Sequence, residues 1–408
     1  MATTVRYLDE AERYGARNYH PLPVVLERGE GSYVWDVDGR RYLDMLSSYS
    51  ALNQGHRHPR IVEALVEQAQ RLTLTSRAFH NDRLGPFLRR LCQVTGYEQA
   101  LPMNTGAEAV ETAIKAARKW GQDVKHVAEG DAEIVVFDGN FHGRTTTIIS
   151  FSSEPLYRQG FGPFTPGFRL VPYGDLQALR GAMSRRTIAV LVEPIQGEAG
   201  VVVPPPGFMK GVEALCREHG ALLLGDEIQT GLGRTGRLFA CDWENVRPDV
   251  LIVGKALGGG LYPVSAILAD EPVMGVFTPG THGSTFGGNP LAAAVGLAAL
   301  DVIVEERLPE RAAELGAWFM DELRALASPV VREIRGKGLL IGVVIREDAG
   351  PARPFCEALM ARGILAKETH EQVLRLAPPL VVTKAQLEEA LPAIADVLTG
   401  PRPVGLPE

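Results

Sequence analysis

Short apolar runs that alternate with helix-like segments fill the middle of this 408-residue chain. The runs are EIVVF (133–137), TIAVLV (187–192), ALLLG (221–225), VLIV (250–253) and VSAILA (264–269). They are apolar on both faces, and the segments between several of them have helical spacing; residues 208–219, closed by Gly220, are an example. Strands of this kind, joined by helices, predict an α/β fold with a mostly parallel sheet covered on both sides.

The two ends of the chain have a different pattern. Residues 24–45 alternate like a hairpin with turn glycines, and the chain beyond about residue 310 mixes helices with short strands such as 339–345. A chain of this length favours two domains. We predict an N-terminal part of a small domain, a large domain and a C-terminal part of the small domain at 1–45, 46–309 and 310–408.

Composition and charge exclude several classes of protein. With 42 basic and 49 acidic residues the formal net charge is −7, which provides no basic surface for nucleic acid. No apolar run reaches the roughly 18–20 residues that span a bilayer, and the N-terminus has no signal-peptide core. We expect a cytoplasmic protein without a metal site. The scattered cysteines match neither a disulfide framework nor zinc-ligand spacing: Cys92, Cys216, Cys241 and Cys356.

Lys255 and Asp226 are the first candidates for chemistry. Lys255 follows a predicted strand directly, with a glycine before it and glycines soon after, and the carboxyl end of a strand is where open α/β sheets bind ligands. A lysine that is partly shielded from water can attack an aldehyde. Asp226 follows another predicted strand, where an acid can keep the ring nitrogen of pyridoxal 5′-phosphate (PLP) protonated. Each residue alone is more often a surface group or a helix cap, but the pair predicts a PLP site.

Two segments rich in small residues are candidates for a phosphate site. Residues 103–121 begin with N-T-G-A and continue with helical spacing. The free N–H groups and the dipole of such a helix start bind a phosphate, although a well-capped helix without a ligand is equally common. Residues 282–290 could complete the site or form a tight turn. The candidate residues are Thr105, Gly106, Ala107, Ser284 and Thr285.

A competing motif points to a nucleotide. Gly231, Gly233 and Gly236 match G-x-G-x-x-G, but the residues DEIQT separate the motif from the preceding strand, and no helical pattern follows. The strand–turn–helix that a dinucleotide site requires is absent, so we reject this interpretation.

Together these features resemble the class III aminotransferases, which have the fold-type I PLP architecture. The blocks DEIQTG (226–231) and GKALGGG (254–260) are typical of the class, and NYHPLPVVLERG (18–29) and LSSYSALNQGH (46–56) are similar to its ornithine δ-aminotransferase branch. The resemblance runs from about residue 18 to 380. It implies a large domain with a mostly parallel seven-stranded sheet covered by helices, plus a smaller α+β domain from both termini. It also implies a homodimer, or a higher homo-oligomer, whose site is completed across the interface.

The resemblance implies roles around the cofactor ring. Lys255 would form the Schiff base with PLP, and its amine would later move a proton to and from the substrate. Asp226 would pair with the ring nitrogen and Gln229 would approach the phenolic oxygen. Phe141 and Ile228 would cover the two faces of the ring.

The resemblance also assigns the phosphate site. Gly106 and Ala107 would offer backbone N–H groups, and Thr285 would reach the phosphate from the partner subunit. His142 stands where the animal members carry a tryptophan. We expect it to line the cofactor site without taking part in proton transfer.

Substrate recognition follows from the same resemblance. Arg144 and Arg375 would bind the two carboxylates of 2-oxoglutarate. Glu198 would pair with Arg375 while ornithine is bound and move aside for the oxo acid, because an unpaired buried guanidinium is costly. Tyr19 and Tyr49 would hold the α-amino and α-carboxylate end of ornithine. Without the resemblance, each of these side chains could be an ordinary surface or core residue.

The expected reaction is transfer of the δ-amino group of L-ornithine to 2-oxoglutarate, which gives glutamate and glutamate-5-semialdehyde, the precursor of pyrroline-5-carboxylate. Such a reaction belongs to proline and arginine metabolism. A relative that acts on N-acetylornithine, GABA, lysine or another ω-amine would share the cofactor residues, as would a class III racemase. A non-catalytic PLP-binding protein is a further alternative. The joint presence of Tyr19, Tyr49 and Glu198 favours ornithine.

Overall fold

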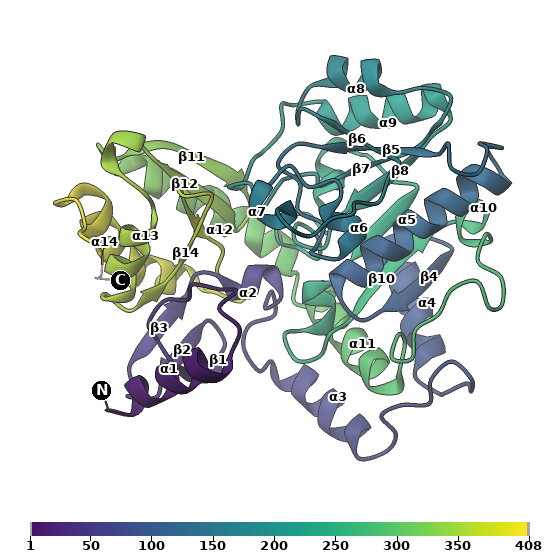
Figure 1. The fold of residues 1–408 in the computed structure, drawn as a ribbon. Helices are drawn as coiled ribbons and strands as arrows, with labels where there is room; N and C mark the ends of the chain where they lie inside the picture. Colours follow the sequence, from purple (N-terminus) through teal and green to yellow (C-terminus); the bar gives the residue numbers. More distant parts are fainter. Residues whose placement is uncertain (1, 406–408) are drawn as a thin grey trace.

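A seven-stranded sheet forms the centre of the molecule in the computed structural model, which describes residues 2–405 (Figure 1). Residue 1 and residues 406–408, at the outer ends of the predicted segments 1–45 and 310–408, lie outside the described residues. From edge to edge the strands are β4 (Gln99–Met103), β10 (Ser265–Ala269), β9 (Val250–Val253), β8 (Leu222–Asp226), β7 (Thr187–Val192), β5 (Glu133–Phe137) and β6 (Phe168–Val171). Strand β10 runs antiparallel to both of its neighbours, and β9, β8, β7, β5 and β6 are parallel. This agrees with the predicted α/β fold and mostly parallel sheet.

Helices cover both faces of this sheet, which explains why its strands are apolar throughout. In β5, Ile134 and Val136 pack into one core with α5, while Val135 and Phe137 pack into another with α8 and α9. Side chains of a strand alternate between its faces, so two covered faces require an unbroken apolar run. The helices and short turns around the sheet are α3 (Pro59–Ala69), α4 (Leu84–Thr95), α5 (Gly106–Asp123), α6 (Thr146–Ile149), α7 (Pro155–Arg158), α8 (Leu176–Ala182), α9 (Phe208–His219), η1 (Ala240–Glu244), η2 (Lys255–Gly258), α10 (Glu271–Met274) and α11 (Pro290–Glu305).

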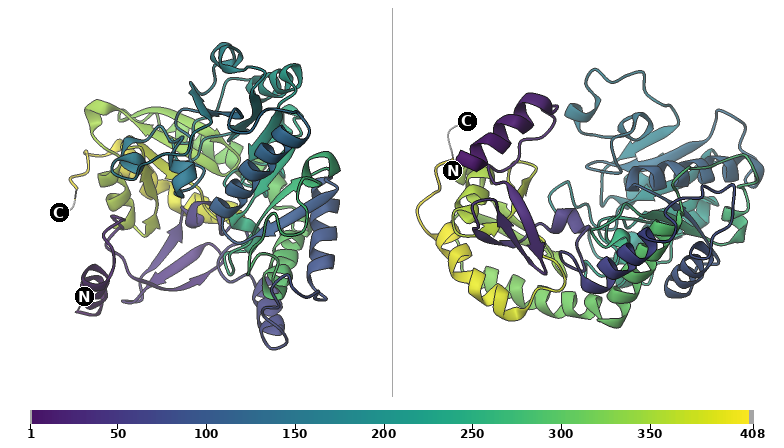
Figure 2. Two further views of the ribbon diagram at one scale, coloured as in Figure 1. Left: turned by 45° about the vertical axis from the view of Figure 1, so that its right-hand side comes forward. Right: turned by 90° about the horizontal axis from the view of Figure 1, so that it is seen from below.

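The two ends of the chain meet beside the large sheet. One four-stranded sheet has the order β1 (Leu26–Glu30), β2 (Tyr33–Asp36), β3 (Arg41–Asp44) and β13 (Ile364–Leu365), and another has the order β11 (Val331–Lys337), β12 (Leu340–Ile345), β15 (Val373–Leu376) and β14 (Lys367–Thr369). Strand β13 pairs in parallel with β3, so an N-terminal and a C-terminal segment share one sheet. The first and the last described helices, residues 2–14 and 384–399, accordingly lie on the same side of the molecule (Figure 2).

The remaining elements are α1 (Ala2–Tyr14), the short turn α2 (Ser47–Ser50), α12 (Leu308–Ala325), η3 (Glu347–Ala349), α13 (Arg353–Met360) and α14 (Lys384–Thr399). The predicted boundary between residues 309 and 310 falls inside α12. Within residues 2–405, no helix combines the length and the apolar character that crossing a membrane requires.

Candidate active site

Lys255 and Asp226 lie at the carboxyl ends of two neighbouring parallel strands. Strand β8 ends at Asp226, which is in register with Ile252 of β9, and Lys255 follows β9 after a single glycine. Lys255 has a φ of 44°, a left-handed conformation that is uncommon for a residue with a side chain and is typical of constrained functional positions. Burial lowers the pKa of its amine, and the charge of Glu198 opposes this effect only in part. The amine is thus more easily deprotonated than that of a surface lysine.

Asp226 is hydrogen-bonded to His142, a contact that the sequence did not predict. His142 Nδ1 lies 2.6 Å from Asp226 Oδ2, and the N–H of Ile228 donates to Asp226 Oδ1 at 3.0 Å. Burial alone would lower the pKa of His142, but the hydrogen bond and the charge of Asp226 outweigh burial and raise it. Both side chains are almost fully buried. The carboxylate is therefore held in one orientation, and its charge acts on the Lys255 amine.

A second buried acid lies behind this pair. The backbone N–H of Phe141 donates to Glu193 Oε2 at 2.9 Å, which fixes the chain directly before His142. Burial raises the pKa of Glu193 to about 8, against the opposing charge of His142. No sequence signal marked Glu193, because a single glutamate after an apolar strand resembles any residue that ends a strand.

Glu198, Arg375 and Gln229 form a compact polar group. Arg375 Nη1 donates to Glu198 Oε1 at 2.6 Å, and Gln229 Nε2 donates to the same oxygen at 3.0 Å. Burial alone would raise the pKa of Glu198, but the charges of Arg375 and Lys255 and these hydrogen bonds lower it to about 2. Because the Arg375 side chain is only 1% exposed, Glu198 neutralises a guanidinium that water scarcely reaches. Lys255 and Glu198 thus act on each other electrostatically.

Tyr49 reaches the same group from a strained turn. Its ring centre lies 4.7 Å from the guanidinium carbon of Arg375. The four residues of α2, Ser47–Ser50, have φ values of 46°, 47°, 60° and 75°, and a left-handed residue other than glycine costs about 1–2 kcal/mol. Asp44 Oδ1 accepts two backbone N–H groups at the start of the turn, at 2.8 Å each, and Ser47 Oγ donates to the carbonyl of Ala377 at 2.8 Å. These contacts hold Tyr49 in a conformation that its sequence does not favour.

Arg234 connects this turn to the large sheet. Its Nη1 donates to the carbonyls of Leu339 and Pro378 at 2.9 and 2.6 Å, and its Nη2 donates to Ser47 Oγ and Asn53 Oδ1 at 2.9 and 2.7 Å. Arg234 is fully buried, and burial lowers the pKa of its guanidinium to about 9. Arg234 belongs to the glycine-rich motif that resembled a nucleotide site. The motif instead carries a buried arginine that binds segments from both ends of the chain.

Arg144 and Tyr19 lie farther out. The guanidinium carbon of Arg144 lies 3.8 Å from the ring centre of Tyr157 and 5.8 Å from that of Phe141. Tyr157 was missed in the sequence, where nothing distinguishes it. Tyr19 is 77% exposed and lines a cavity of about 470 Å³ together with Tyr49. The outer part of the site is therefore aromatic and cationic, and it is open to solvent.

The start of α5 is built as predicted. Thr105 is its N-cap, with a capping box in which Thr105 Oγ1 accepts from the N–H of Glu108 at 3.3 Å. The N–H groups of Gly106 and Ala107, in the first turn, have no backbone acceptor within the helix. A Cβ at Gly106 would lie 3.1 Å from the Ile228 side chain, so glycine allows the helix start to approach Ile228 closely.

The second small-residue segment, residues 282–290, lies beside this helix start. Ser284 Oγ accepts a hydrogen bond from Asn104 Nδ2 at 3.1 Å.

The structure thus gathers most of the predicted residues around one site at the carboxyl ends of β8 and β9. Thr285 is exposed beside Ser284, and its predicted role concerns a second subunit. A family model described as aminotransferase class-III matches residues 14–398.

The chain belongs to the class III aminotransferases.

Class III aminotransferases use PLP, and the chain is a PLP-dependent transferase. The ornithine aminotransferase of Geobacillus sp. (strain WCH70) is 56% identical over 98% of this class III chain and 100% of its own length. That of Bacillus subtilis (strain 168) is 56% identical over 98% of each chain. Among solved structures, the ornithine aminotransferase of Toxoplasma gondii, which has partial occupancy of PLP at its active site, superimposes with a TM-score of 0.96, at 47% identity over 97% of this chain and 94% of that one. The acetylornithine aminotransferase of Elizabethkingia anophelis gives a TM-score of 0.88 at 49% identity, over 97% and 98% of the two chains.

Proposed function

We propose that this aminotransferase moves the δ-amino group of L-ornithine to 2-oxoglutarate and produces glutamate-5-semialdehyde, which cyclises to pyrroline-5-carboxylate, and glutamate. One observation carries the proposal: Glu198 neutralises the buried Arg375, against which Tyr49 lies, while Arg144 and Tyr19 are exposed farther out. A donor with its carboxylate far from the reacting amine fits this arrangement. The named ornithine aminotransferases at 56% identity support the same donor.

Residues at the carboxyl ends of β8 and β9 fit the ring of PLP. Lys255 would hold the cofactor through its amine, Asp226 would face the ring nitrogen, and Phe141 and Ile228 would cover the ring. Gln229 Oε1 is buried without a hydrogen-bond partner among the described residues, so a hydrogen-bond donor of a ligand would complete its bonding. When bound, PLP supplies an aldehyde that captures amines and an electron-withdrawing ring that stabilises negative charge on the substrate carbon.

The phosphate would lie at the start of α5. Gly106 and Ala107 would donate backbone N–H groups, and the hydroxyl of Thr105, which accepts from the helix, still has its proton to donate. Ser284 lies beside this helix start, and Thr285 would serve the site of a partner subunit in a homodimer. This last role would make the dimer necessary for activity.

Each of the remaining residues would have a distinct role in the reaction. Asp226, oriented by His142, would keep a negative charge at the ring nitrogen. The Lys255 amine, whose pKa burial lowers, would act first as the base that takes a proton from the substrate carbon. It would then act as the acid in the proton transfer that follows. Glu198 on Arg375 would deny the inner site to the donor's carboxylate, so that the donor presents its δ-amine. When Glu198 moves aside, Arg375 and Arg144 could bind both carboxylates of 2-oxoglutarate.

A donor comparison tests the proposal. The purified holoenzyme is incubated with L-ornithine, N-acetylornithine, GABA or L-lysine, with and without 2-oxoglutarate, and glutamate and pyrroline-5-carboxylate are measured. We expect sustained pyrroline-5-carboxylate formation only with ornithine and 2-oxoglutarate together. N-Acetylornithine is the substrate in the name of the 49% identical Elizabethkingia anophelis enzyme. If it is turned over faster than ornithine, N-acetylornithine is the donor and the proposal is wrong. Formation of D-ornithine without an oxo acid would indicate a racemase.

A further inference from the structure

The segment that carries Tyr19 has no regular secondary structure to hold it. Helix α1 ends at Tyr14 and β1 begins at Leu26, so residues 15–25 form neither a helix nor a strand. The side chain of Tyr19 is nevertheless part of the cavity that also includes Tyr49. An exposed tyrosine on an irregular segment recognises a ligand well only if its backbone is fixed from elsewhere.

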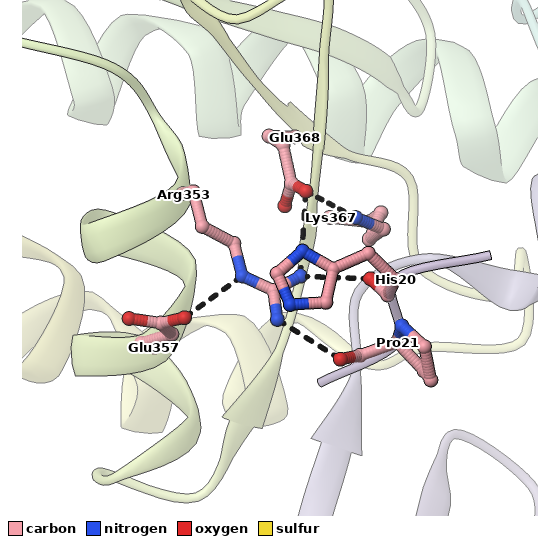
Figure 3. Close-up of polar contacts among 6 residues, drawn as sticks. All are labelled: His20, Pro21, Arg353, Glu357, Lys367 and Glu368. Atoms are coloured by element: carbon pink, nitrogen blue, oxygen red, sulfur yellow. Dashed lines mark hydrogen bonds and ion pairs between the residues drawn. The ribbon is translucent and has the colours of Figure 1, made fainter. Parts of the chain in front are cut away.

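Arg353, the first residue of α13, provides that fixation (Figure 3). Its Nη1 donates to the carbonyl of His20 at 3.2 Å, and its Nη2 donates to the carbonyl of Pro21 at 2.9 Å. These are the two residues that directly follow Tyr19. Since a guanidinium is planar and rigid, binding two successive carbonyls sets the direction of the chain as well as its position.

Two acids orient the guanidinium. Arg353 Nε donates to Glu357 Oε1 at 2.8 Å, one turn along α13, and Nη1 lies 3.4 Å from Glu368 Oε1, which also binds Lys367. The side chains of Arg353, Glu357 and Glu368 are 17%, 10% and 19% exposed, so solvent screens this group less than an ordinary surface ion pair. Arg353 is therefore held in one conformation before it meets the N-terminal segment.

The same group touches the site through β14. Lys367 lines the cavity with Tyr19 and Tyr49, and the hydroxyl of Thr369 donates to the backbone carbonyl of Glu198. Glu368, which lies between Lys367 and Thr369 in β14, binds Arg353. One arginine thus connects the segment of Tyr19 to the strand that contacts Glu198.

We propose that Arg353 is a positioning residue for the amino donor. It holds the backbone after Tyr19 so that Tyr19 closes the outer end of the cavity over the α-amino and α-carboxylate end of the donor. The choice of donor rests on the proposed function, but the fixation of residues 15–25 does not. Loss of Arg353 affects a donor that needs Tyr19 and spares the acceptor, whose carboxylates meet Arg375 and Arg144.

The test compares Arg353→Gln with Arg362→Gln in the holoenzyme. Arg362 follows α13 and pairs with Asp396 of α14 and with the carbonyl of Ala358 rather than with residues 15–25, so it is a matched control. Hydrogen–deuterium exchange of peptides from residues 15–25 should become faster in R353Q only. The KM for L-ornithine should rise about tenfold, as expected for lost charged hydrogen bonds, with kcat and the KM for 2-oxoglutarate changed by less than about twofold. Arg353→Lys, which keeps the charge but cannot bind two carbonyls in a fork, should give an intermediate result and serves as a second variant if R353Q does not fold.

Unchanged exchange at residues 15–25 in R353Q would overturn the proposal, as would faster exchange with an unchanged KM for the donor. An equal effect of R362Q would reduce Arg353 to a general stabilising residue. If the wild-type enzyme does not use ornithine, the proposed function fails, whereas the exchange measurement, with the KM of whichever donor is used, still decides the role of Arg353.

Discussion

The two sides of the active site are built in different ways. The cofactor side, with Asp226 and Lys255, stands on the ends of neighbouring parallel strands inside the large sheet. The donor side, with Tyr19 and Tyr49, stands on an irregular segment and on a left-handed turn brought in by the N-terminal end of the chain. The first is fixed by a continuous ladder of backbone hydrogen bonds, and the second by a few side chains.

This difference separates chemistry from selectivity. Sheet ends hold reacting groups rigidly, and any amino donor needs the same lysine and acid. The donor side depends on Arg234 and Arg353, each of which binds backbone carbonyls from distant segments. Such contacts can be altered without disturbing the sheet. Changes on the cofactor side should therefore affect every substrate, and changes on the donor side should affect substrates differently.

The largest effect should come from Lys255→Ala. Without the amine that holds the cofactor and moves the proton, turnover with every donor should fall by more than about a thousandfold. The visible absorbance of the bound cofactor should also change. Lys210→Ala, a lysine on the surface of α9, is the control. Retained turnover in K255A would show that the cofactor side does not carry the chemistry, and would contradict the contrast between the two sides.

Arg234→Lys should produce the next largest effect, on stability and, through the turn that carries Tyr49, more on the KM for ornithine than on that for 2-oxoglutarate. A single ammonium cannot serve the carbonyls of Leu339 and Pro378 together with Ser47 and Asn53. Each buried acceptor left without a donor costs about 1–3 kcal/mol, so we expect the free energy of unfolding to fall by about 3 kcal/mol or more. Urea unfolding of the holoenzyme measures this. Arg237→Lys, a neighbouring arginine that stacks on Trp243, should change stability little; an equal loss there would contradict the assignment.

Glu198→Gln should alter selectivity more than stability. The amide no longer neutralises Arg375, so donors with a carboxylate close to the reacting amine should gain access. We expect the ratio of kcat/KM for ornithine over glutamate to fall about tenfold, in line with the loss of one charged contact. Equal changes for both donors would contradict the switch.

The pH dependence sharpens the same prediction. The pKa of Glu198 is lowered to about 2. Its pairing with Arg375 is therefore fully present at any pH above the ordinary pKa of a glutamate, and it is lost only as the pH falls toward about 2. The donor ratio of the wild-type enzyme should therefore show no titration of Glu198 in the neutral range. A change of the ratio with an apparent pKa near that of a free carboxyl group would contradict the buried pair.

The smallest effect should follow Tyr157→Leu. Arg144 lies over the Tyr157 ring at 3.8 Å, and such a contact contributes about 0.5–1 kcal/mol where the arginine is exposed, as it is here. The KM for ornithine and for 2-oxoglutarate should each rise between about twofold and fivefold, with little change in kcat, because both substrates would use Arg144. Tyr33→Leu removes a similar arginine–tyrosine contact on the small sheet and is the matched control. A selective effect on ornithine would assign Tyr157 to the donor alone.

Much of the cofactor side could be predicted from the sequence. The apolar runs at 133–137, 187–192 and 250–253 are strands in the structure with the same bounds, and the run at 221–225 is shifted by one residue. Burial on both faces leaves a strong local pattern, so the strands and the residues at their ends follow from it. The division into domains at residues 45 and 309 stays a prediction.

The donor side could not be predicted in this way. A turn of four left-handed residues at Ser47–Ser50 contains no glycine and leaves no local signal. The partners of His142, Arg234 and Arg353 come from segments far away in the chain, and nothing in the neighbouring sequence specifies them. Local periodicity determines which residues form strands, because alternation and burial act over a few residues. Only the packing of both ends of the chain against the sheet decides which side chains complete the site.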